Sequence, residues 1–133
     1  MARDIIAANL AAVAAHFHSE ASGSVENALG LYTDDIVWEA PSRNLVIKGK
    51  EAVAANYRYM FSGVKDIEFH SMDRFATEDR VVDDCIATFE ITKSGFHDFP
   101  VGSKCEMRLT HIFEMREGKI SKETGFEGPL KAR

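Results

Sequence analysis

The sequence predicts an α+β fold, in which helices from the first half of the chain pack on an antiparallel sheet formed mainly by the second half. Two observations support this. Before Gly63, apolar residues recur every three or four positions, the period of a helix with one buried face. After Gly63, apolar and polar residues alternate, the period of a strand with one wet face. Helices followed by a run of strands are typical of α+β domains.

The first helix is expected to start near Asp4 and to run to about His18. Its buried stripe holds apolar residues at helical spacing: Ile6, Leu10, Val13 and Phe17. This alanine-rich segment superficially resembles a secretory signal. Asp4 and Asn9 interrupt that pattern, so we interpret it as a packed helix and expect a cytoplasmic protein.

Two further helices are expected before Gly63. The second begins after Ser24 and ends at Asp34 and Asp35. Its buried stripe is Val25, Ala28, Leu29 and Tyr32. The third begins at Gly49 and ends at Gly63. Its buried stripe is Val53, Tyr57, Met60 and Phe61.

The strands are predicted from alternation and from proline. A short strand over 36–40 ends at Pro41, and a brief strand is expected over 45–47. Long strands are expected over 64–76, 80–92, 101–115 and 119–127, with Glu117-Gly118 turning the chain into the last one.

Composition bounds the possible functions. The chain has 133 residues, which we interpret as one domain over 1–133, and a net charge of −5, which argues against nucleic acid or anionic lipid as a partner. No uncharged apolar run approaches the roughly 18 residues of a membrane span. The two cysteines, Cys85 and Cys105, lie in apolar strand patterns and are expected to be reduced core thiols.

Two ionisable residues occupy apolar positions of their strands. His111 lies between Leu109 and Phe113, and Asp83 shares the inward parity of its own strand. A hairpin centred near His97 places Asp83 opposite His111, whereas a shift of two residues pairs Asp83 with Leu109 or Phe113. A carboxylate beside an imidazole raises its pKa and fixes its tautomer, as general acid–base catalysis requires. The same pattern also fits a buried polar contact in a core, and both interpretations remain open.

Aromatic residues on inward positions have two interpretations as well. Tyr57 either packs in the core or donates its hydroxyl to a ligand carbonyl. Trp38 is interpreted as a pocket residue because its strand ends at a proline-containing loop. His16, near the end of the first helix, faces either the sheet or solvent. The sequence contains no nucleotide-binding, P-loop or metalloprotease motif and no histidine pair at metal spacing, so no cofactor and no metal are expected.

Two segments resemble the nuclear transport factor 2-like superfamily, in particular its SnoaL-like and ketosteroid isomerase-like branch. One runs from Ala28 through Asp34-Asp35-Ile36-Val37-Trp38 to Pro41 and continues into Ile47-Lys48-Gly49. The other covers 111–120 and ends in Glu117-Gly118-Lys119-Ile120. The resemblance implies a cystatin-like cone, a strongly curved antiparallel sheet that wraps three helices and encloses an apolar pocket. It also implies a homodimer formed through the outer sheet face, where Ile112 and Phe99 are the apolar candidates.

The resemblance can be followed residue by residue for the ketosteroid isomerases. The position of their general-base aspartate is Ala40 here, which argues against their standard mechanism. The position of their oxyanion-hole aspartate aligns with His111, one pocket tyrosine matches Tyr57, and the other maps close to His16.

These residues predict a protein that binds a small, mostly apolar molecule. The predicted catalytic set is His111 as base, Asp83 as its orienting partner and Tyr57 as donor to a developing enolate, in cyclase, dehydratase or isomerase chemistry. The alternative is a non-catalytic ligand-binding or accessory protein. The residues expected to line the pocket are His16, Phe17, Tyr32, Trp38, Ala40, Met60, Phe89, Met107, Phe113 and Phe126.

Overall fold

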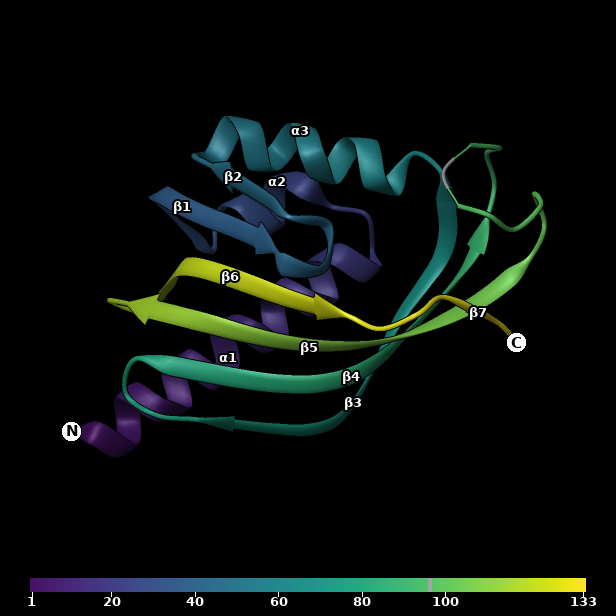
Figure 1. The fold of residues 1–133 in the computed structure, drawn as a ribbon. Helices are drawn as coiled ribbons and strands as arrows, with labels where there is room; N and C mark the ends of the chain where they lie inside the picture. Colours follow the sequence, from purple (N-terminus) through teal and green to yellow (C-terminus); the bar gives the residue numbers. More distant parts are fainter. Residues whose placement is uncertain (96) are drawn as a thin grey trace.

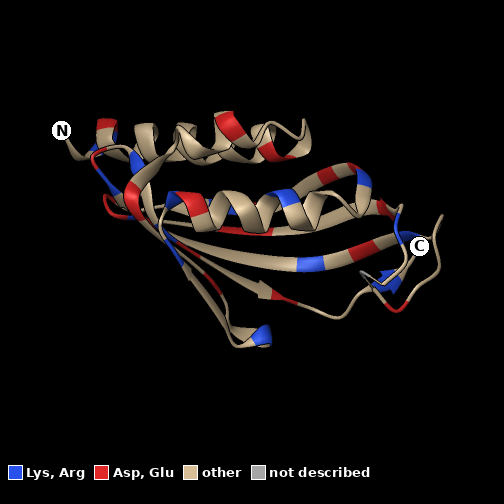
Figure 2. Cartoon of the chain, turned by 90° about the horizontal axis from the view of Figure 1, so that it is seen from above, with Lys and Arg blue, Asp and Glu red and all other residues tan. Residues whose placement is uncertain are grey.

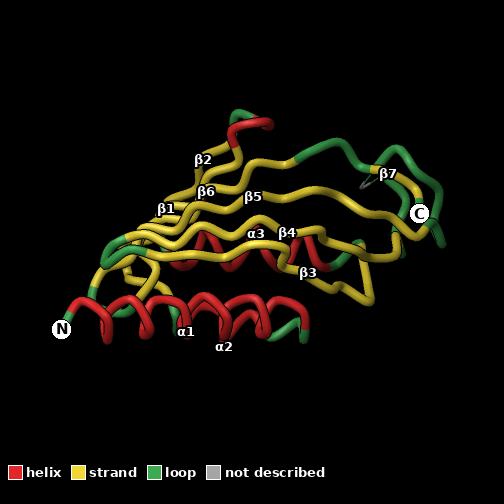
Figure 3. Tube along the Cα trace, turned by 90° about the horizontal axis from the view of Figure 1, so that it is seen from below, coloured by secondary structure: helices red, strands yellow, loops and turns green. Residues whose placement is uncertain are grey.

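A computed structural model describes residues 1–95 and 97–133. Three helices lie on one face of a curved sheet: α1 (Ala2–Ala21), α2 (Val25–Leu29) and α3 (Lys50–Phe61). Figure 1 shows α3 over one end of the sheet and α1 behind its other end, and Figure 3 shows both helices on the same side of the strands. The predicted α+β class with three helices on a curved sheet is confirmed.

The sheet of the described residues has the strand order β2-β1-β6-β5-β4-β3, and the short β7 pairs with β5. The strands are β1 (Tyr32–Ala40), β2 (Leu45–Lys48), β3 (Val64–Ala76), β4 (Arg80–Ile91), β5 (Lys104–Arg116), β6 (Lys119–Glu127) and β7 (Lys131–Ala132). A short 3₁₀ turn, Pro41–Arg43, joins β1 to β2.

The sheet is mixed, so the prediction of a purely antiparallel sheet is wrong in one place. β1 runs parallel to β6, while every other pairing of the described strands is antiparallel. Alternation shows which segments are strands, but it does not show which strand returns to lie beside β1.

Two element boundaries also differ from the prediction. Tyr32 begins β1, because α2 ends at Leu29 and the chain is already extended at Asp34 and Asp35. α1 continues past His18 to Ala21. That extra turn adds a residue to the inner face of the helix, which matters for the site below.

The core lies between the helices and the concave face of the sheet. Its largest fully buried side chains come from α1, α3 and the strands β1, β4, β5 and β6, among them Val13, Tyr32, Tyr57 and Phe113. Cys85 and Cys105 are buried and free, as predicted. Within the described ranges, no helix combines the length and the hydropathy needed to cross a membrane.

Candidate functional site

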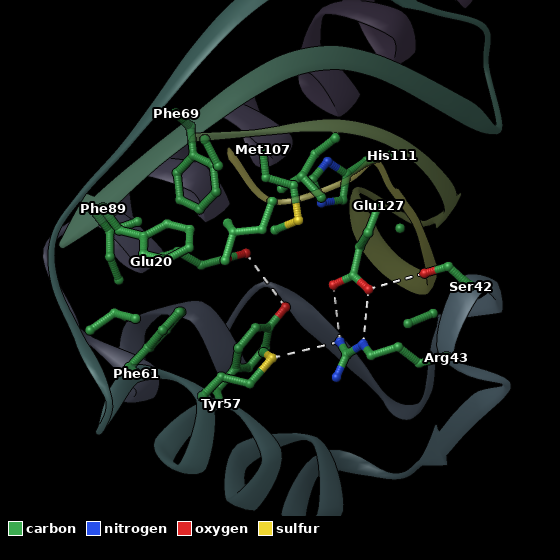
Figure 4. Close-up of a pocket in the computed structure, with 18 of the residues that line it drawn as sticks. Glu20, Ser42, Arg43, Tyr57, Phe61, Phe69, Phe89, Met107, His111 and Glu127 are labelled. Carbon is green, nitrogen blue, oxygen red and sulfur yellow. Dashed lines mark hydrogen bonds and ion pairs between the residues drawn. The ribbon is translucent and has the colours of Figure 1, made fainter. Parts of the chain in front are cut away.

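The concave face of the sheet and the inner faces of α1 and α3 surround a cavity of about 660 Å³. Most of its wall is apolar and aromatic. The main apolar contributors are Trp38, Met60, Phe61, Ile67, Phe69, Phe89, Met107 and Leu109. Four inward polar side chains, Glu20, Tyr57, His111 and Glu123, also reach the wall. We call these four the polar end of the cavity; Figure 4 labels the first three.

Each polar-end residue comes from a different element. Glu20 lies in the last turn of α1, Tyr57 on the buried face of α3, His111 on β5 and Glu123 on β6. β5 and β6 place His111 directly opposite Gly125, so Glu123 is two residues away on the same face. A Cβ at Gly125 would lie 3.6–3.7 Å from Cδ2 and Nε2 of His111, so that edge of the ring faces β6.

Glu123 is the centre of a buried hydrogen-bond network. Its Oε1 accepts hydrogen bonds from the hydroxyls of Tyr32, at 2.7 Å, and Tyr57, at 3.1 Å. His16 Nε2 lies 3.2 Å from the same oxygen and also pairs with Glu20. The other oxygen, Oε2, lies 3.8 Å from Nε2 of His111. These contacts explain how a carboxylate that is 2% exposed is accommodated.

The phenol hydrogens of Tyr32 and Tyr57 are used inside this network. The two hydroxyls lie 2.7 Å apart, and their other polar contacts with described residues go to Glu20, Glu123 and His16. Two hydrogens shared among these acceptors leave none for a ligand. In the structure, Tyr57 therefore holds carboxylates in place, which differs from the expected donor to a ligand carbonyl.

The network also determines the charge of its members. Burial alone would lower the pKa of His16, but the carboxylates of Glu20 and Glu123 outweigh it and raise the pKa to about 10. Burial opposes ionisation of Glu123, yet the charge and hydrogen bond of His16 lower its pKa to about 2. Burial first, and then the neighbouring carboxylate of Glu123, raise the pKa values of Tyr32 and Tyr57 well above the usual phenol value. His16 and Glu123 thus form a buried ion pair at neutral pH.

Asp83 lies directly opposite His111, in the register that the sequence predicted. Its Oδ2 accepts hydrogen bonds from Ser71, at 2.7 Å, and Arg74, at 2.6 Å. Its Oδ1 and the Nδ1 of His111 are both buried without a hydrogen-bond partner among the described residues. Because Nε2 faces β6, Nδ1 lies on the ring edge towards β4 and Asp83. Asp83 is fully buried behind His111 and does not reach the cavity wall.

Two groups of side chains have donor atoms within 4.8 Å of one another, a spacing that suits a metal ion: Asp83 with Cys85 and His111, and His16 with Glu20 and Glu123. Protein contacts already occupy both groups. His16 Nε2 is paired with two carboxylates, and Arg74 holds Asp83. Burial, followed by the Asp83 charge, raises the pKa of the Cys85 thiol to about 12. These interactions account for the clusters without a bound ion.

The predicted site residues divide into three groups. The cavity wall includes Trp38, Ala40, Tyr57, Met60, Phe89, Met107 and His111. A layer directly behind the wall contains His16, Phe17, Tyr32, Asp83 and Phe113, which are all buried. Phe126 is wrongly predicted, because it is 45% exposed on the outer face of the sheet. Ala40 faces the cavity, so the isomerase base position has the expected place but no carboxylate.

Alternation failed at Phe126 for a physical reason. The register of β5 and β6 shifts between Glu114 and Met115, and this shift reverses which residues of β6 point inward after Ile120. The reversal turns Phe126 outward and brings Glu123 inward.

Sequence reasoning missed the four charged residues of the described wall: Glu20, Glu123, Arg43 and Glu127. Arg43 and Glu127 form a two-pronged ion pair, with Nε–Oε1 at 2.8 Å and Nη2–Oε2 at 3.1 Å (Figure 4). The Arg43 guanidinium also lies 5.5 Å from the Trp38 ring. The sequence contained one indication of Glu20, which lies four residues after His16 and so on the same face of α1. The helix was predicted to end at about His18, so Glu20 was placed outside it.

Comparison with known families identifies this architecture. The model of the SnoaL-like domain matches residues 10–123, so the chain belongs to the SnoaL-like family. Comparison with curated protein sequences gives no match.

Solved structures with this fold are similar over most of the chain. A SnoaL-like polyketide cyclase candidate from Jannaschia sp. CCS1 has a TM-score of 0.82 at 17% identity, over 92% of this chain and 87% of that one. An LEH-like epoxide hydrolase of M. tuberculosis has a TM-score of 0.76 at 17% identity, over 92% and 84%. A polyketide cyclase candidate from Xanthomonas campestris pv. campestris has a TM-score of 0.74 at 16% identity, over 92% and 91%. At these identities the similarity establishes the fold, and function has to be argued from the site.

Proposed function

We propose that this protein is a cofactor-independent acid–base enzyme that acts on a small, mostly apolar molecule, in chemistry of the cyclase, dehydratase or isomerase type. The observation that carries the proposal is the position of the His111 ring. The ring reaches an apolar cavity, and the buried carboxylates of Glu123 and Asp83 lie on either side of it. Structural similarity to cyclase candidates and to an epoxide hydrolase agrees with chemistry of this kind.

In the proposed reaction, His111 accepts a proton from carbon next to a ligand carbonyl and later returns it. Nε2 is the atom assigned to this step, because it lies close to Glu123 and Gly125, which both line the cavity. The Glu123 carboxylate offsets the charge that the imidazole gains. Asp83 acts as a positioning residue on the Nδ1 side, and Arg74 holds Asp83 in place. Tyr57 positions Glu123 in turn.

The experiment uses exchange of carbon-bound hydrogen, because it reports proton removal without knowledge of the natural substrate. The α-protons of 2-tetralone are followed by NMR in D₂O with wild-type protein, with His111→Gln and with His70→Gln as the control. His70 is an exposed histidine of β3. The protein-dependent exchange rate is expected to fall about 100-fold in His111→Gln and to stay unchanged in His70→Gln.

The alternative function is ligand binding without chemistry, and the Tyr57 contacts favour it, since the hydroxyls of Tyr32 and Tyr57 offer a ligand no free hydrogen. If 2-tetralone binds but wild-type protein and His111→Gln exchange its protons equally, catalysis is refuted and the binding function stands.

A homodimer through the outer sheet face remains a prediction. Ile112 and Phe126 are 36% and 45% exposed there, on the neighbouring strands β5 and β6. Phe99 packs against the inner cluster of Phe89 and Ile91, so it is not a candidate for that face. Figure 2 shows acidic and basic residues interspersed along the chain, as expected for a protein with no nucleic-acid partner.

A further inference from the structure

We infer that the cavity selects ligands with a cationic group, such as a protonated amine, held at the polar end with the apolar part of the ligand against the aromatic wall. This inference rests on the proposed function, because it names the class of molecule that the same cavity accepts. It follows from a count of the hydrogen-bond donors, acceptors and charges that face the cavity.

The polar end offers acceptors and has no hydroxyl hydrogen to spare. The phenol hydrogens of Tyr32 and Tyr57 are committed to the Glu123 carboxylate and to each other. Both contacts of Glu20 with described polar side chains, Tyr57 and His16, go to its Oε1. Glu123 directs Oε2 towards His111 at 3.8 Å, which is too long for a hydrogen bond. A ligand that reaches these oxygens must therefore supply the donors itself.

The charges favour a cation in the same way. Glu20 and Glu123 share one basic partner, since the same Nε2 atom of His16 contacts both carboxylates, so acidic groups outnumber fully buried basic groups here. Among the described wall residues, Arg43 is the one lysine or arginine, and Glu127 neutralises it. Burial lowers the pKa of His97, the other histidine of the wall, so it adds no charge at neutral pH.

The wall completes the environment that an ammonium group prefers. Aromatic rings of Trp38, Tyr57, Phe61, Phe69 and Phe89 line the cavity. A cation gains from the negative faces of such rings, most of all where water is excluded. The Arg43 guanidinium, 5.5 Å from the Trp38 ring, is an example already present in the molecule. Desolvation also strengthens the attraction between an ammonium group and the carboxylates.

The test compares three ligands of similar size that differ in charge: benzylamine, which is protonated at pH 8, neutral benzyl alcohol and anionic benzoate. Binding is followed through the fluorescence of Trp38, the single tryptophan of the chain, which lies in the cavity wall. We expect benzylamine to bind at least about tenfold more tightly than benzyl alcohol, and benzoate to bind most weakly.

A charge variant separates the local effect from net charge. Glu20→Gln keeps the shape of the side chain and is expected to abolish the preference for benzylamine. Glu51→Gln removes the same charge from an exposed position at the start of α3, and it is expected to leave the preference unchanged.

The wild-type comparison decides the inference even if Glu20→Gln does not fold. If benzyl alcohol or benzoate binds as tightly as benzylamine, the inference is overturned while the cavity remains a ligand site. If none of the three ligands, nor 2-tetralone, changes the fluorescence of Trp38, the proposed function fails together with it.

Discussion

Glu123→Ala is expected to lower the free energy of unfolding by about 3–5 kcal/mol. The variant leaves the buried hydroxyls of Tyr32 and Tyr57 without their shared acceptor and removes one of the two carboxylates that neutralise His16. A buried polar group without a hydrogen-bond partner is destabilising, because nothing replaces the hydrogen bonds to water that it lost on folding. Urea unfolding at pH 7 measures the difference directly.

Glu114→Ala is the matched control for this experiment. Glu114 also lies in the sheet and faces an arginine, Arg80, at 3.6 Å, but its side chain is 39% exposed. Its replacement is expected to change stability by less than about 1 kcal/mol. If Glu123→Ala were no more destabilising than Glu114→Ala, the network around Glu123 would not be a significant source of stability.

The second large effect is a loss of stability at alkaline pH. The pKa of His16 is raised to about 10 in the folded protein, while an unfolded histidine has a pKa of about 6.5. The folded state therefore binds one proton more than the unfolded state between these values, and stability falls as pH rises through this window. The stabilisation is fully present below pH 6.5 and is lost above pH 10. The total change is on the order of 5 kcal/mol.

The acid limb has the opposite sign. The pKa of Glu123 is lowered from 4.5 to about 2, so its contribution is present above pH 4.5 and is lost as pH falls towards 2. Urea midpoints from pH 6 to pH 10, for wild type and for His16→Gln, isolate the alkaline limb. Wild type should lose stability across this range, and His16→Gln should show a much flatter profile. Parallel profiles would contradict the assignment of the alkaline limb to His16.

The His111–Asp83 pair shows what alternation can predict. Both residues lie on unbroken stretches of β4 and β5, so parity placed them inward and hairpin symmetry placed them opposite each other. The hydrogen bonds of Asp83 were not predictable in this way. They come from Ser71 and Arg74 on β3, on either side of the register shift between Ser71 and Asp73.

Glu123 shows where prediction from apolar–polar alternation fails. An irregularity in one strand reverses the inward parity beyond it, and no residue pattern in β6 marks that point. Glu123, the centre of the polar network, was therefore missed, and Phe126 was wrongly placed in the pocket. Glu20 was missed for a different reason, because helix ends are poorly determined by apolar spacing when the last turn carries polar residues.

The measurement that most directly tests the account is an NMR spectrum of the histidine side-chain nitrogens, recorded with and without 2-tetralone at pH 8. The chain has five histidines, and His111→Gln assigns the one at issue. The account predicts that the ketone shifts the ring resonances of His111 and leaves those of the exposed His18 and His70 unchanged. Resonances of His111 that do not move when the ketone is bound would show that the ligand does not contact this imidazole, and the proposed base would then be wrong.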